Sequence, residues 1–220
     1  VKDKKAYTVK FTPTDSSASY DGTLTASVLP EISKYPLQLS SVAVEDKTYD
    51  GTTNADISSV TFEGSVTLQK DKDYTVTASF DDASVGSGKN VTATVTLMEQ
   101  TAKNYALEQS SFFATGSITK AATPTNIQSG TLTITNGLHK TYSFDLSTLL
   151  PKLTAPCDYG TITYDKKVDT NLGVGSFITL VNGKTGELTL EANRSGTDEG
   201  QFGTITVTIS TSNYQDITLT

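Results

Sequence analysis

The sequence predicts an all-β protein made of antiparallel β-sandwich modules, and both composition and patterning support this fold class. Threonine accounts for 39 of the 220 residues and alternates with apolar residues over short stretches. This alternation is typical of strands that have one buried and one solvated face. The chain is also long enough for two or three modules of roughly 100 residues each.

Predicted strands follow one another along the whole chain. Period-two alternation marks residues 23–28, 73–80, 90–97, 130–135, 160–165, 187–192 and 203–210. Asn-Gly pairs at 136–137 and 182–183 favour positive φ and predict hairpin turns, the second one within a longer loop. One short helical turn is expected near residue 147, with Asp145 or Ser147 as its cap and Pro151 as its end.

Three tyrosines suggest where modules close. Tyr20, Tyr105 and Tyr214 each stand in a small polar loop between two strands. In immunoglobulin-like sandwiches, a tyrosine at a strand corner packs its ring into the end of the core. We therefore predict tandem immunoglobulin-like antiparallel β-sandwich modules that end in these hairpins. Three unrelated surface tyrosines remain the alternative.

Prolines after the first two hairpins, Pro36 and Pro124, predict short and stiff linkers. The predicted division is an incomplete β module over residues 1–36, a complete module over 37–121 and another over 122–220. Residues 1–36 are too few to bury a core and are interpreted as the last strands of a module. A β-grasp arrangement is the alternative for the middle module, although residues 53–72 show no convincing helix pattern.

A set of signature residues lies in the middle module. It comprises Lys47, Tyr49, Asp50, Gly51, Thr52, the turn and strand 85–92, Asn104-Tyr105, Ile118 and Lys120-Ala121. In this order the residues resemble the YDG module of large bacterial surface proteins, over about residues 39–121. The flanking segments resemble other bacterial immunoglobulin-like modules. The resemblance implies an extracellular or cell-wall location in a stalk or adhesin, and it implies no particular ligand.

The charge balance and the single cysteine narrow the function further. A net charge of −7 disfavours binding to nucleic acid and to anionic membrane surfaces. No apolar run approaches the roughly 18 residues of a membrane span, so no membrane insertion is expected. Because Cys157 is the only cysteine, no intrachain disulfide can form. Nothing near it in the sequence would activate the thiol, and we expect a buried or half-buried side chain.

Candidate residues for catalysis or metal binding are few. His139 is the only histidine, and no nucleophile motif accompanies it, so an exposed strand histidine is expected. One histidine and one cysteine cannot complete a zinc site, which needs three or four such ligands. Asp71, Asp73, Asp81 and Asp82 lie close in sequence and are weak candidates for calcium, with solvated turns as the favoured interpretation.

The predicted function is structural, with no catalysis and no cofactor. We expect a monomeric fragment of a secreted or cell-wall-attached bacterial surface protein that acts as a stalk, a spacer or a set of adhesion modules. The alternative is a module that binds a host glycan or extracellular protein through loops 81–89 or 193–203. The aromatic residues available for such binding are Phe177, Phe202 and Tyr159. A hydrolase is less favoured, because it needs a cleft.

Overall fold

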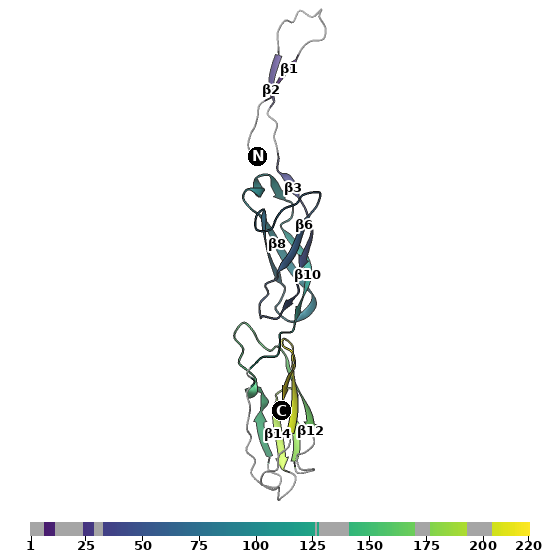
Figure 1. Cartoon of the computed structure of the whole chain (residues 1–220), viewed down its shortest axis with the longest axis vertical. Helices are drawn as coiled ribbons and strands as arrows, with labels where there is room; N and C mark the ends of the chain where they lie inside the picture. The colour runs from purple at the N-terminus through teal and green to yellow at the C-terminus, as the bar shows by residue number, and fades with distance from the viewer. Residues whose placement is uncertain are drawn as a thin grey trace, which may run out of the picture. The chain divides into compact units, whose positions relative to one another are not determined.

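The computed structural model describes residues 7–11, 24–28, 33–125, 127, 141–169, 177–192 and 204–220 (Figure 1). These residues form an all-β protein with six sheets and two short 3-10 helices. The chain divides into two compact units. The first unit comprises Val1–Ala43, Ile57–Thr77 and Ala93–Phe113, and the second comprises Val44–Asp56, Ala78–Thr92 and Ala114–Thr220.

The first unit contains short strand pairs and, in its described part, one cluster of buried side chains. Strands β1 (Tyr7–Phe11) and β2 (Leu24–Val28) pair antiparallel. Strand β3 (Tyr35–Leu37) pairs parallel with β9 (Tyr105–Leu107), which follows the 3-10 helix η1 (Thr101–Lys103). Strand β4 (Leu39–Val44) is bonded to β6 (Ile57–Phe62). The buried cluster consists of Leu37, Phe62, Tyr74 and Val95.

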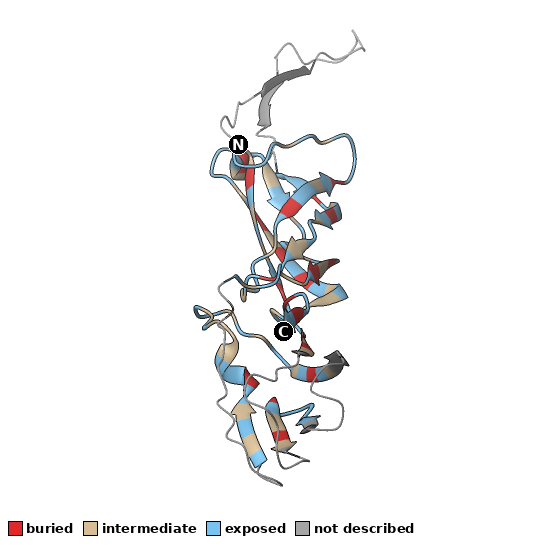
Figure 2. Cartoon of the chain, turned by 60° about the horizontal axis from the view of Figure 1, so that its bottom comes forward, coloured by how far each residue is buried: buried red, intermediate tan, exposed pale blue. Residues whose placement is uncertain are grey.

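A four-stranded sheet contributes residues to both units. Its order is β5 (Lys47–Thr48), β10 (Ser111–Thr119), β8 (Gly86–Leu97) and β7 (Tyr74–Phe80), with β5 parallel to β10. Figure 2 shows buried and exposed positions interspersed along the strands, and β7 buries its first and last residues while the positions between them alternate. The threonines take the solvated positions, as the sequence pattern predicts.

Two three-stranded antiparallel sheets make up most of the second unit. One has the order β11 (Thr141–Asp145), β14 (Glu187–Ala192), β13 (Phe177–Val181). The other has the order β12 (Ile162–Asp169), β15 (Thr204–Thr211), β16 (Ile217–Leu219). Side chains from both sheets pack in one buried cluster around Tyr164, Val207, Ile209 and Ile217. The two sheets therefore share a core.

Most of the predicted elements are present. The all-β class is confirmed, and strands lie in six of the seven predicted stretches; the seventh, 130–135, and the Asn136-Gly137 pair lie outside the described residues. The predicted helical turn is the 3-10 helix η2 (Leu146–Leu149). Asp145 caps it by accepting a 2.9 Å hydrogen bond from the Ser147 amide, and the helix ends before Pro151.

Two local predictions are wrong. The predicted hairpin is present, since β13 and β14 pair antiparallel. Its loop runs over Asn182–Gly186 and is longer than a type I′ turn. The residue with positive φ is therefore Gly186 (75°) and not Gly183. The Asn182 side chain instead accepts bonds from the Lys184 and Thr185 amides. Pro36 lies in β3 rather than in a linker. Because β3 belongs to a two-stranded sheet, it is an edge strand, and proline is tolerated in edge strands.

Residues 53–72 also test the β-grasp alternative for the middle module. Residues 53–72 are all described, and they contain β6 and no helix. A β-grasp arrangement would need a helix in this segment.

Candidate functional site

The Tyr-Asp-Gly-Thr sequence at residues 49–52 forms a tight turn directly after β5. Strand β5 enters the turn beside the end of β10, and the Tyr49 amide donates a 2.8 Å bond to Thr119 O. The Asp50 Oδ1 atom accepts 2.8 Å bonds from both the amide and the hydroxyl of Thr52. An aspartate that binds the backbone two residues ahead closes a turn by itself.

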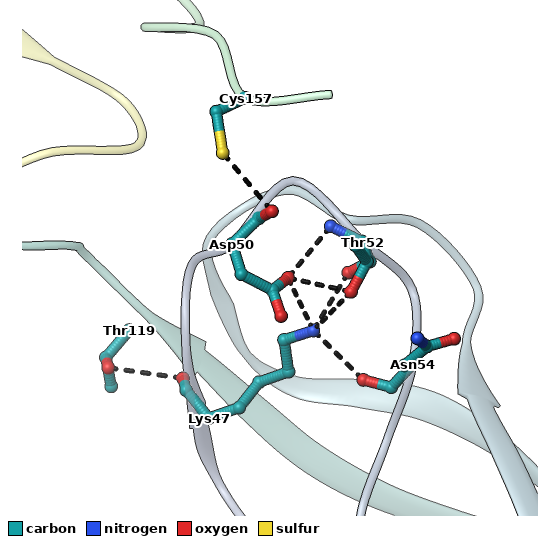
Figure 3. A network of polar contacts seen from close by, with 6 residues as sticks. All are labelled: Lys47, Asp50, Thr52, Asn54, Thr119 and Cys157. Carbon is teal, nitrogen blue, oxygen red and sulfur yellow. Dashed lines mark hydrogen bonds and ion pairs between the residues drawn. The ribbon is translucent and has the colours of Figure 1, made fainter. Parts of the chain in front are cut away.

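The Lys47 side chain binds oxygen atoms of this turn through its Nζ atom (Figure 3). Its Nζ atom lies 2.7 Å from Asp50 Oδ1 and donates 3.0 Å bonds to Thr52 O, Thr52 Oγ1 and Asn54 O. The side chain is 15% exposed, so these acceptors replace most of its hydration. Desolvation alone would raise the pKa of Asp50, but the hydrogen bonds from Lys47 and Thr52 outweigh it and lower that pKa.

The Tyr49 side chain packs against residues far along the chain. Its ring is buried and meets the Tyr214 ring edge-on, with centroids 5.7 Å apart and an interplanar angle of 76°. The Tyr49 hydroxyl accepts a 3.1 Å bond from the Asp158 amide. The Tyr159 ring is tilted against the Tyr214 ring, with centroids 5.4 Å apart. The Tyr159 hydroxyl donates a hydrogen bond to Pro151 O. Three tyrosines thus form one cluster with β10 residue Ile118.

The backbone of the turn touches the segment around Cys157. The Cys157 thiol donates a 3.2 Å bond to Asp50 O (Figure 3). Gly51 has a φ of 76°, and a Cβ atom at this position would lie 2.8 Å from Cys157 N and from Pro156 C. Such distances are too short for any side chain. Gly51 is therefore needed both for its conformation and for this close approach.

The surface that receives the turn consists of Pro156, Cys157, Asp158, Tyr159, Asn213 and Tyr214, and we call it the Tyr214 surface. Asn213 Nδ2 donates bonds to Asp158 O (3.2 Å) and Asp158 Oδ1 (2.9 Å). Asn213 is 5% exposed, and its Oδ1 accepts no bond from the described residues.

Two tyrosines of this surface have raised pKa values. Burial is the main cause that raises the pKa of Tyr214, and Cys157, Tyr49 and Tyr159 add to it, bringing the value to about 12. Burial likewise raises the pKa of Tyr159. The phenol groups of Tyr159 and Tyr214 therefore stay protonated at physiological pH.

The four aspartates proposed for calcium fall into two pairs, one before and one after the seven-residue strand β7. In the first pair, Asp71 has a φ of 64° and Asp73 Oδ2 accepts a 2.8 Å bond from the Gln69 amide. In the second, Lys89 Nζ lies 2.7 Å from Asp82 and 3.7 Å from Asp81. Among the described residues no group of three or more His, Cys, Asp or Glu is placed to hold a metal ion. The calcium site remains a prediction.

The remaining predicted residues have different positions. Tyr105 lies in β9 and meets the ring of Tyr35. Tyr20, His139 and Phe202 lie outside the described residues, as does the side chain of Phe177. Cys157 is half-buried, as expected. Asp158 and Pro156 were missed, and no sequence pattern could have indicated them, because Cys157 and Asp50 are 107 residues apart in the chain.

These features define the class of protein. It is an all-β chain with a Tyr-Asp-Gly-Thr turn that Lys47 closes and that packs against distant residues of the same chain. The family model described as YDG domain matches residues 32–112. The match includes the turn and Asn104-Tyr105, and it ends before Ile118, Lys120 and Ala121. No curated protein matches the chain. Within the described part of the chain, no helix is long and apolar enough to cross a membrane.

Proposed function

We propose that this chain is a non-catalytic segment of a secreted or cell-wall-attached bacterial surface protein. In this proposal, serial immunoglobulin-like β-sandwich modules form a stalk or spacer, or present adhesion modules. The all-β fold and the YDG domain match support it. The observation that carries it is the role of Lys47, Tyr49 and Asp50, which bind the backbone and side chains of other residues of the chain.

A spacer must hold distant parts of its chain in a defined arrangement, and the YDG turn does this within the second compact unit. The turn lies within the matched region, whereas Cys157, Asp158 and Tyr214 lie outside it. Tyr49 is 7% exposed and Tyr214 is 9% exposed, so the contact is desolvated. A buried aromatic pair with hydrogen-bonded neighbours resists separation better than a solvated linker does.

The alternative is a module that binds a glycan or extracellular protein. Tyr159, one of the aromatic residues considered for this role, is half-buried, with its ring against Tyr214 and its hydroxyl bonded to Pro151 O. The exposed large apolar residues of the described part are instead Tyr35, Met98, Phe113 and Leu180.

Two measurements on the intact chain separate these functions. A screen against glycans and extracellular matrix proteins should detect no specific binding if the chain is a spacer. Pulling the chain by its termini between reference domains should give discrete unfolding events at forces typical of folded β modules. Specific retention of one glycan or protein, abolished by a Phe113→Ala or Tyr35→Ala change, would contradict the spacer function and support the binding module.

A further inference from the structure

Two places in the chain have the same backbone arrangement around an Asn-Tyr pair. In the second unit, the Ala121 amide donates a 2.9 Å bond to Asn213 O, and Ala121 pairs parallel with Tyr214. In the first unit, the Tyr35 amide donates a 2.8 Å bond to Asn104 O, and Tyr35 pairs parallel with Tyr105. A lysine precedes the incoming residue in each case, Lys120 before Ala121 and Lys34 before Tyr35.

The two places differ in what covers the tyrosine. Tyr214 is 9% exposed, and the ring of Tyr49 from the YDG turn covers it. Tyr105 is half-buried and packs against the cluster around Leu37. Its ring contact among the described residues is with Tyr35, edge-on at 6.1 Å and 77°. Tyr35 itself is 55% exposed. The surface formed by Lys34, Tyr35, Asn104 and Tyr105, which we call the Tyr105 surface, therefore presents an aromatic ring to solvent.

We propose that the Tyr105 surface binds a Tyr-Asp-Gly-Thr turn of a neighbouring YDG-type module, as the Tyr214 surface binds the turn of this chain. The inference rests on the proposed function, since it requires modules in series. An incoming tyrosine would cover Tyr35, which would remove two aromatic faces from water. The shared register and the lysine at the same position indicate that the two surfaces are versions of one docking arrangement.

Charge supports the same occupant. The turn segment 45–56 contains Glu45, Asp46, Asp50 and Asp56 but only one lysine, so its net charge is 1 − 4 = −3. The Tyr105 surface carries Lys34, which is exposed. Lys103, two residues before Tyr105, is already paired with Glu99 at 3.8 Å, so Lys34 is the charge that counts here. Opposite charges at the rim favour association and orient the partner.

A cyclic peptide of residues 45–56 is a suitable probe, because Glu45 N and Asp56 O are only 2.9 Å apart in the folded turn and its ends can be joined. Titrated into the intact 15N-labelled chain, it should shift the amide signals of Tyr35 and Tyr105. Since a tethered turn acts at an effective concentration of about millimolar, a dissociation constant of about 1 mM suffices. Tyr35→Ala in the chain, or Tyr49→Ala in the peptide, should weaken binding at least tenfold. Phe113→Ala, which removes another exposed aromatic ring, should leave it unchanged.

Several outcomes would overturn the inference. The first is the absence of any amide shift at Tyr35 or Tyr105 with about 5 mM peptide, which exceeds the effective concentration of a tethered turn. The second is a set of shifts confined to Tyr214 and Cys157. The third is a shift at Tyr35 that depends on protein concentration without peptide, as binding of a second copy would produce. A ligand found in the glycan and matrix screen would instead contradict the spacer function and leave this titration unaffected.

Discussion

At the scale of single residues, each signature residue of the turn makes a different stabilising contact. Asp50 closes the turn through Thr52, and Lys47 neutralises the carboxylate while it binds two backbone carbonyls. Tyr49 supplies the apolar contact and Gly51 permits the close approach to Cys157. The Asp50 side chain is 54% exposed, so its ion pair with Lys47 adds little on its own and matters chiefly for geometry.

Replacing Gly51 with alanine should destabilise the chain strongly. A non-glycine residue at positive φ costs about 1 kcal/mol, and forcing the Pro156 and Cys157 backbone away adds about 2 kcal/mol. Gly88→Ala is the matched control, because Gly88 also has a positive φ, 63°, but no atom lies within 4 Å of its would-be Cβ. Urea unfolding should show a loss about threefold larger for Gly51→Ala. Equal losses would mean that the contact with Cys157 contributes nothing.

Asp82 should stabilise the fold above acidic pH only. Hydrogen bonds from Lys89 and Ser84 lower the pKa of Asp82 to about 2, against roughly 3.9 in an unfolded chain. Its contribution is therefore complete above about pH 4 and disappears as the pH falls through about 2. Because its side chain is 57% exposed, the contribution should be about 0.5 kcal/mol.

The unfolding free energy measured between pH 5 and pH 2 checks this prediction. Asp82→Asn should flatten the acid decline relative to the unchanged chain. Asp81→Asn, which alters a carboxylate 3.7 Å from the same lysine, should change it less. The assignment to Asp82 fails if the two variants have the same pH profile.

At the scale of elements, the strands were predictable because their threonine alternation depends only on local sequence. Strand β14 begins and ends at the residues that the alternation indicates, and Asp145, one of the two predicted caps, caps η2. The position of positive φ in the loop after Asn182 is wrongly predicted, because the loop has five residues and its left-handed residue is Gly186. The contact of Asp50 with Cys157 could not be predicted, since it depends on tertiary packing between distant segments.

The connection between β15 and β16 offers a test of one element. The buried Thr211 hydroxyl accepts a 2.9 Å bond from the Tyr214 amide and donates a 3.0 Å bond to Tyr214 O. Thr211→Val keeps the shape but leaves both backbone groups unsatisfied, so it should cost about 2 kcal/mol. Thr218→Val, at an exposed position in β16, should change the urea midpoint little. A similar midpoint for both variants would show that the Thr211 bonds do not hold this connection.

At the scale of the whole molecule, the shifted pKa values fall into two sets. Carboxyl pKa values are lowered and tyrosine pKa values are raised. The carboxyl set is Asp50, Asp82 and Asp145, and the tyrosine set is Tyr74, Tyr159, Tyr164 and Tyr214. The carboxyl groups with lowered pKa values lose their stabilising contribution only in acid. The tyrosines with raised pKa values lose theirs only in alkali. The structure thus predicts a broad plateau of stability around neutral pH.

The alkaline limit of this plateau should depend on Tyr214. The folded chain keeps the Tyr214 proton up to about pH 12, whereas an unfolded chain loses it near pH 10. The folded state therefore binds more protons in this interval, and stability is complete below about pH 10 and falls as the pH approaches 12. Tyr214→Phe removes the titrating hydroxyl, so the alkaline unfolding midpoint should rise by about 0.5 pH unit. Circular dichroism and phenolate absorbance, recorded together, measure it. Tyr35→Phe, at an exposed ring, is the control, and an equal rise in both variants would contradict a special role for the buried cluster.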